Sequence, residues 1–288
     1  MKKVIIAALL FLGIHSCSKT DDVFIKNNQP PIDKTIDSST ILLYINKTYV
    51  NLMGREPVGS EQAQALSILK QNNFSIDNRK QFLDVLLNRP EYKRNLFIVA
   101  NAEFLNSIDS SDVANQIYLF QLFVTQPQYA PFVDVLNMEI ARMTALNKTK
   151  QDLVSGALDY KGMLKRITDN YFYDQINMGT ENFVVFSFIN YLFRYPSDAE
   201  LAQGKIMVDG NNATLFLQLG NSKSDFINIF FDSNDYFEGQ VRYIFKKYLF
   251  REPTSAEITF YANPYKATGD YTAMQKNIFS TDEYAGIK

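Results

Sequence analysis

Histidine and cysteine support most nucleophilic and transition-metal chemistry in proteins, and each occurs only once in this 288-residue sequence, as His15 and Cys17. Since both end an amino-terminal apolar run, we expect His15 to be removed with a leader and the Cys17 thiol to be modified. A mature chain without either group excludes Ser-His-Asp and Cys-His catalysis, His- or Cys-ligated zinc and haem, and internal disulfides. Carboxylate chemistry, hydroxyl or lysine nucleophiles and oxygen-ligated calcium or magnesium remain open.

The chemistry that we predict for Cys17 is lipidation. Lys2 and Lys3 precede an unbroken apolar run from Val4 to Ile14, which would span about 16 Å as a helix, roughly half of a bilayer's hydrocarbon core. Residues 14–17 resemble the lipobox of bacterial lipoproteins, with an aliphatic residue three positions before the cysteine and a small one directly before it. We therefore predict a signal peptide at residues 1–16, with Cys17 as the lipidated amino terminus carrying palmitate. The alternative, a buried thiol in a retained helix, fits a lone cysteine at the end of the run poorly.

The residues after Cys17 indicate where the lipoprotein is delivered. Ser18 to Asp22 read Ser-Lys-Thr-Asp-Asp, which is similar to the signal that sends Bacteroidota-type lipoproteins to the outer face of the outer membrane. Residues 17–39 show no apolar periodicity, and we predict that they form a lipidated flexible tether. The expected location is the outer membrane, lipid-anchored and facing the cell exterior.

Charge and hydropathy argue against two classes of partner. The sequence has 29 Lys and Arg against 31 Asp and Glu, and loss of Lys2 and Lys3 leaves a net charge of −4. With no basic cluster, nucleic acid is not an expected partner. Because the longest other apolar stretch, residues 183–193, is too short to cross a bilayer, the lipid is the only membrane attachment predicted.

An internal motif recurs three times along the chain. In each copy an aromatic residue lies six positions before an Arg, while a Pro and a Glu follow that Arg by two and six positions. Further along, each copy has an apolar segment that ends in an acidic residue followed by Tyr. The Arg, Pro, Glu and Tyr positions are Arg55, Pro57, Glu61 and Tyr92; Arg194, Pro196, Glu200 and Tyr236; and Arg251, Pro253, Glu257 and Tyr284.

Physical chemistry gives this motif a structural interpretation. Apolar residues at helical spacing precede the Arg, which then lies at the negative end of the helix dipole, and the Pro ends the helix. Ser197 with Glu200 and Thr254 with Glu257 match capping boxes, whereas Val58 replaces the hydroxyl residue in the first copy. We expect the Arg and Glu to pair across the turn, and each Tyr to be buried with its hydroxyl bonded. A ligand or interaction site at the motif is the alternative.

The motif resembles the short helical repeat of bacterial secreted and surface-layer proteins. The signature of that family is Leu-Gly-Arg-x-Pro-Asp followed by a later Ser-x-Glu-Tyr or Ser-x-Glu-Phe, and the family, whose function is unknown, is similar to phycobilisome linker domains. Residues 52–57 with 89–92, and 249–253 with 280–284, carry the resemblance. Phe193 and Phe250 replace the family glycine, and the Asp after Pro is absent. The resemblance implies an all-helical adhesion, scaffold or linker role without catalytic residues.

The expected fold is therefore all-α, with about three divergent copies of a helix-turn-helix unit. We divide the mature chain into a helical domain at residues 40–180, with the first copy and a degenerate middle, and another at 181–288 with the second and third copies. Apolar spacing after Val133 predicts a helix, and residues 147–150 a turn. Residues 209–212 and 232–235 are interpreted as polar turns rather than calcium loops, so no metal or cofactor is expected.

Two classes of function follow from these expectations. The favoured one is a non-enzymatic structural or protein-interaction module of the cell envelope whose partners are other envelope proteins. The alternative is a surface glycan binder, or a glycan hydrolase that uses two carboxylates. The sequence contains no Trp, the best flat amphipathic platform for a sugar, which weakens the glycan alternative.

Overall fold

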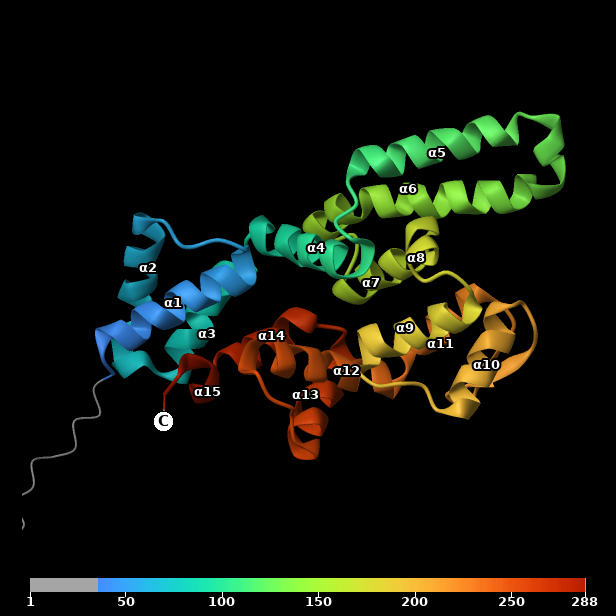
Figure 1. The fold of residues 1–288 in the computed structure, drawn as a ribbon. Helices are drawn as coiled ribbons and strands as arrows, with labels where there is room; N and C mark the ends of the chain where they lie inside the picture. Colours follow the sequence, from blue (N-terminus) through green and yellow to red (C-terminus); the bar gives the residue numbers. More distant parts are fainter. Residues whose placement is uncertain (1–35, 288) are drawn as a thin grey trace, which may run out of the picture. The chain divides into compact units, whose positions relative to one another are not determined.

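The computed structural model describes residues 36–287, which belong to one compact unit, and the predicted all-α fold class is confirmed. Cys17, the signal peptide and most of the predicted tether lie outside the described residues, so their assignments remain predictions. The helices are α1 (Ser38–Met53), α2 (Gly59–Leu69), α3 (Ile76–Leu87), α4 (Pro90–Leu105), α5 (Ser110–Val124), α6 (Val133–Ser155), α7 (Tyr160–Thr168), α8 (Tyr171–Ile176), α9 (Thr180–Leu192), α10 (Asp198–Val208), α11 (Lys223–Asp232), α12 (Asn234–Ile244), α13 (Ser255–Thr268), α14 (Tyr271–Phe279) and α15 (Asp282–Ala285) (Figure 1). Shorter turns of helix are η1 (Gln71–Phe74), η2 (Pro127–Phe132) and η3 (Phe245–Leu249), and the strands are β1 (Ala213–Leu215) and β2 (Gln218–Gly220).

Local sequence explains where many of these helices begin and end. Side-chain oxygens of Ser75, Asp109 and Asp159 accept hydrogen bonds from backbone N–H groups in the first turns of α3, α5 and α7. Gly54 and Gly156 end α1 and α6 in the left-handed conformation, which glycine adopts without strain. Short local segments therefore determine where these helices are capped and where the chain turns.

The first and third copies of the motif pack against each other. Helix α1 contacts α15, α3 contacts α14, and the Tyr44 hydroxyl on α1 donates to the Phe279 carbonyl at 3.1 Å. Helix α12 connects the later copies because it packs on both α9 and α13. The predicted domain boundary between residues 180 and 181 falls inside this compact unit, and the division into two helical domains remains a prediction.

The structure corrects one expected turn and adds an element that the sequence did not suggest. Residues 147–150 lie within α6 because Leu146, Thr149 and Leu153 continue its buried face. The Thr149 hydroxyl donates to the Ala145 carbonyl at 2.8 Å, so this polar residue is satisfied within the helix. The added element is the antiparallel pair β1–β2. Among residues 36–287, no helix has both the length and the apolar character needed to span a membrane.

Candidate functional site: arginine corners, a strained hairpin and a groove

The three motif arginines make the same set of contacts. In the third copy, the Arg251 guanidinium donates to both oxygens of Glu257 at 2.9 and 2.5 Å and to both oxygens of Glu283 at 2.6 and 2.7 Å. Its remaining N–H donates to the carbonyl of Glu252 at 3.0 Å. Arg55 repeats this pattern with Glu61, Glu91 and the Glu56 carbonyl. Arg194 donates to both oxygens of Glu200 and to the Tyr195 carbonyl, and two of its N–H groups share one oxygen of Asp235, Oδ2. We call each set an arginine corner.

An arginine corner leaves its guanidinium with no donor for a ligand. A guanidinium carries five N–H donors, and in each corner two bond the motif Glu, two bond the acidic residue before the Tyr, and one bonds a backbone carbonyl. The predicted Arg–Glu pairing across the turn is confirmed. The second acidic partner, Glu91, Asp235 or Glu283, was not anticipated, and it joins the two halves of each copy.

The motif Glu has a second task at the start of the following helix. Glu200 and Glu257 each accept from the backbone N–H of their N-cap residue, Ser197 at 2.8 Å and Thr254 at 2.7 Å, while the cap hydroxyls accept from the Glu N–H. In the first copy Glu61 accepts from the Val58 N–H at 3.0 Å, although valine has no hydroxyl to return the bond. The two predicted capping boxes are confirmed, with half of one in the first copy.

The motif tyrosines are buried and bonded as predicted. The Tyr92 hydroxyl donates to Gln275 at 2.7 Å, and the Tyr284 hydroxyl accepts from the Asn51 amide at 2.9 Å. The Tyr236 hydroxyl lies 3.2 Å from that of Tyr265. All three rings are at most 1% exposed. Burial raises the pKa of each hydroxyl, so the tyrosines serve as neutral core residues.

The corners predict a specific loss of stability in acid. Hydrogen bonds from the motif arginines lower the pKa of Glu61, Glu200 and Glu257 to about 2. Because the folded-state pKa lies below that of the unfolded chain, this stabilisation is complete above about pH 4.5 and is lost as the pH falls toward 2. We expect denaturant titrations to show a fall of about 1–2 kcal/mol per corner over this range. Glu257→Gln should be less stable at pH 6 and lose less on acidification; an identical acid profile would contradict the assignment.

The turn between β1 and β2 is strained and apolar. Leu215 pairs with Gln218, so Phe216 and Leu217 alone form the turn, with φ values of +47° and +64°. Two-residue turns of this kind normally contain Asn-Gly, because bulky side chains are costly at positive φ. The Phe216 ring packs near those of Phe188 and Phe230, whereas Leu217 is 97% exposed and Leu219 is 73% exposed. The hairpin thus exposes two leucines to water, and its two turn residues have strained, positive φ values.

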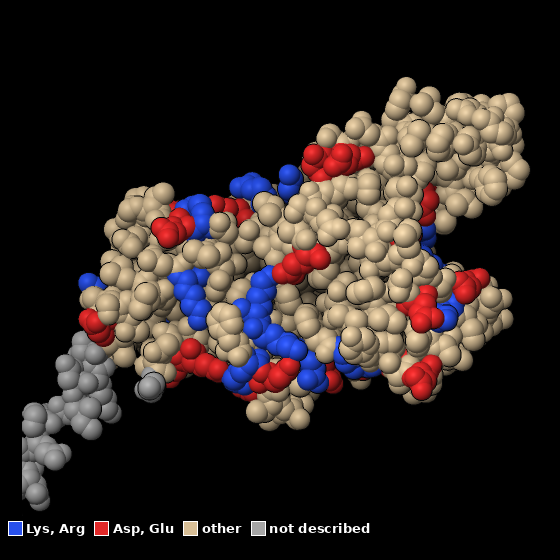
Figure 2. All heavy atoms as spheres, in the orientation of Figure 1, with Lys and Arg blue, Asp and Glu red and all other residues tan. Residues whose placement is uncertain are grey.

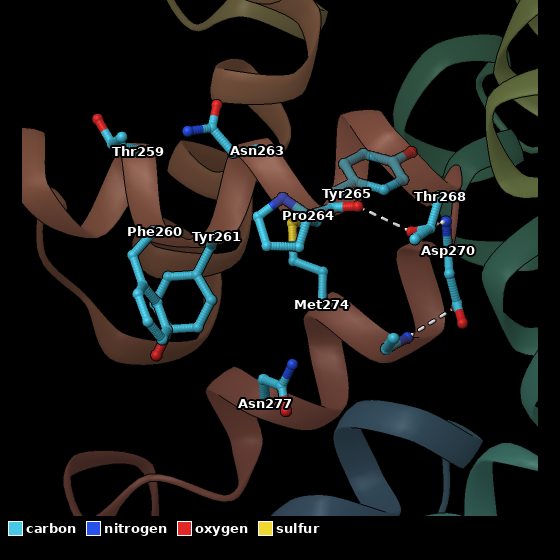
Figure 3. A pocket seen from close by; sticks show the side chains of 11 residues that line it. Thr259, Phe260, Tyr261, Asn263, Pro264, Tyr265, Thr268, Asp270, Met274 and Asn277 are labelled. Carbon is cyan, nitrogen blue, oxygen red and sulfur yellow. Dashed lines mark hydrogen bonds between the residues drawn. The ribbon is translucent and has the colours of Figure 1, made fainter.

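A groove of about 370 Å³ lies between α13 and α14 (Figure 3). Pro264 and Met274 lie at its centre, with Phe260 and Tyr261 on one side and Asp270 at the far end. Since Pro264 has no N–H, it cannot make the helical hydrogen bond to the Phe260 carbonyl. Asn263 and Asn277 add amides to the lining. Aromatic faces beside amides suit a neutral polar ligand.

The carboxylate in the groove and many of those outside it are used in capping or ion pairs. Asp270, the one carboxylate among the groove residues, accepts from the Ala273 N–H at 2.8 Å and caps α14. Residues 209–212 form a polar turn, as interpreted from the sequence, and residues 232–235 form the junction of α11 and α12, where Ser233 caps α12. Within residues 36–287, no three His, Cys, Asp or Glu side chains are grouped to hold a metal ion.

No family model, curated protein or solved structure matches this chain.

Proposed function

We propose that this chain is an outer-membrane lipoprotein, anchored through Cys17 at the cell surface, that acts as a structural or protein-interaction module of the envelope. The resemblance of its motif to the helical repeat of secreted and surface-layer proteins supports this role. The arginine corners support it too, because their donors are all used within the fold and the motif is explained as architecture.

The observation that carries the proposal is the β1–β2 turn. Positive φ at Phe216 and Leu217 costs of order 1 kcal/mol at each residue, and such strain concentrates at binding sites. Leu217 and Leu219 are both exposed, so neither side chain offsets this strain by packing within the fold. An apolar pocket on a partner protein would bury both leucines, whereas a soluble glycan would gain little from them.

A single substitution separates recognition from folding at this turn. Leu217→Gly removes an exposed side chain and relieves the positive φ, so the melting temperature should stay the same or rise. We expect envelope proteins that co-purify with the wild type from native membranes to be lost with Leu217→Gly. Leu43→Ala, which trims an exposed leucine of α1, is the matched control and should retain them. Full retention of the same partners by Leu217→Gly would refute the proposal.

Anchoring has its own test. Cys17→Ser should leave an unprocessed or soluble protein, because the thiol that accepts the lipid is gone, while the wild type partitions into detergent. Mass spectrometry of the mature wild type should find a lipidated amino-terminal Cys17, and an unmodified Cys17 would end the claim. Proteinase added to intact cells should degrade the protein; complete protection would argue against surface exposure.

The groove between α13 and α14 favours a second candidate, a glycan binder. Phe260 is 70% exposed, and its ring offers a face on which a sugar can stack in the groove that Asn263 and Asn277 also line. A hydrolase is less well supported, because Asp270 lines the groove without a second carboxylate. Calorimetry against a panel of polysaccharides decides between the candidates. Micromolar binding that Phe260→Ala abolishes, with no co-purifying protein, would favour the glycan binder.

A further inference from the structure

Helix α5 has an apolar surface that the described fold leaves uncovered. It packs mainly on α6 and η2, and its Phe120 ring contacts the ring of Tyr171 on α8, with 5.3 Å between the centroids; Figure 1 shows α6 running alongside it. Phe120 is buried, whereas Tyr118 and Leu122, two residues before and after it, lie on the opposite side and are exposed together with Leu119. A helix that is apolar both inward and outward normally has a partner on each side.

The exposed apolar surface continues around the closed end of the α5–α6 hairpin. Phe132, at the end of η2, is also exposed there. From Val113 through Val133 the chain has no charged residue, although amide side chains such as Asn115 and Gln121 are exposed. Figure 2 shows the outer end of this hairpin free of charged atoms on the face in view. We call the exposed residues Tyr118, Leu119, Leu122 and Phe132, all within the stretch that has no charged residue, the hairpin face.

We infer that the hairpin face is a dimer interface, covered by the same face of a second copy of this chain. An uncharged surface neither repels its own copy nor needs a partner of opposite charge. Amide side chains both donate and accept, so those of two identical faces can bond each other across a two-fold axis. Two such hairpins packed together form a four-helix bundle, which buries the outward side of α5 in each copy.

A lipid surface fits the same face less well. Helices that lie on membranes usually flank their apolar side with Lys and Arg that meet lipid phosphates, and residues 113–133 contain neither. The exposed amides would lose water on entering acyl chains without gaining bonds. A second copy satisfies both the apolar groups and the amides, and is therefore the favoured occupant.

The size of the face indicates a weak dimer in solution. Helix α5 has 15 residues and is about 22 Å long, and α5 and α6 side by side form a strip about 20 Å wide. The area that such a strip can bury is small for a stable interface. Anchoring on one membrane would raise the effective concentration of copies and favour pairing there. The hairpin face and the β1–β2 turn consist of different residues. The dimer is therefore tested independently of the proposed envelope partner.

Cysteine cross-linking of the full chain in native membranes tests the dimer. The described residues contain no cysteine, and Cys17 has no free thiol in the lipidated chain that we propose, so Leu122→Cys places a unique free thiol on the hairpin face. A thiol cross-linker about as long as the roughly 8–10 Å between packed helices should give a band at twice the monomer mass. Leu43→Cys, more exposed but on α1, should give none. Adding Leu119→Glu to Leu122→Cys should abolish the band, because facing carboxylates would repel, without lowering the melting temperature.

Three results would overturn the inference. The first is a monomer for both Leu122→Cys and a second reporter, Tyr118→Cys. The second is a cross-linked product of another mass, which would assign the face to a different protein. The third is binding of the Cys17→Ser chain to phosphatidylethanolamine vesicles that is lost on Leu122→Glu, which would assign it to lipid. A band at twice the monomer mass that Leu119→Glu removes and Leu217→Gly leaves intact supports the dimer. This result holds whether or not envelope proteins co-purify with the chain.

Discussion

Gly239→Ala is expected to lower the free energy of unfolding by about 3 kcal/mol or more. Gly239 lies in α12, where a Cβ would meet the backbone oxygen of Tyr191 at 2.2 Å and the Cα of Leu192 at 2.8 Å. Backbone atoms of α9 cannot rotate away as a side chain can, so the two helices would have to separate. Denaturant unfolding followed by circular dichroism measures the loss.

Gly59→Ala is the matched control for this substitution. Gly59 begins α2 and a Cβ there meets nothing within 4 Å, so alanine should stabilise the helix by about 0.5–1 kcal/mol through its propensity. Equal stability of the Gly239→Ala and wild-type proteins would show that α9 and α12 do not pack as closely as described.

Arg79→Ala is expected to cost about 3–5 kcal/mol, because it removes a buried cation with three acceptors. Arg79 on α3 is 1% exposed; it donates to the Ser280 carbonyl at 2.8 Å and the Phe74 carbonyl at 3.2 Å, and pairs with Asp282. Alanine leaves these carbonyls unpaired and a cavity between the first and third copies. Thermal melting of the purified chain checks the size of the effect.

Lys276→Ala tests whether charge alone holds these copies together. Lys276 on α14 pairs with Asp84 on α3 at 2.8 Å, also between the first and third copies, but both side chains are partly exposed. Its loss should cost at most about 1 kcal/mol. A similar effect for Lys276→Ala and Arg79→Ala would mean that burial adds nothing at Arg79.

Residues close in sequence revealed most of the corner chemistry. Arg251, Thr254 and Glu257 lie within one turn and the start of the next helix, so fixed offsets predicted both their pairing and the cap. Glu283 was missed because its distance from the Arg varies between copies: the chain must fold before the two halves of a copy meet. The all-α class followed from apolar spacing for the same local reason.

Long-range packing and strain could not be predicted. Nothing near Arg79 in the sequence indicates that it becomes buried against Ser280 and Asp282, which lie about two hundred positions away. Gly239 reads as a weak point in a helix, and only the approach of Tyr191 explains it. The β1–β2 turn was missed because Phe-Leu lacks the Asn-Gly signal that marks such turns, and this departure is what makes it a functional candidate.

We propose that the motif arginines build the fold while recognition occurs at other surfaces, and Arg251→Ala separates these two roles. Melting and co-purification from native membranes are measured on the same preparation, at a temperature where the variant is folded. We predict a loss of about 1–3 kcal/mol of stability, from five broken hydrogen bonds and a weakened cap, with the wild-type set of envelope proteins retained. An Arg251→Ala protein that melts like the wild type but has lost those partners would contradict the claim.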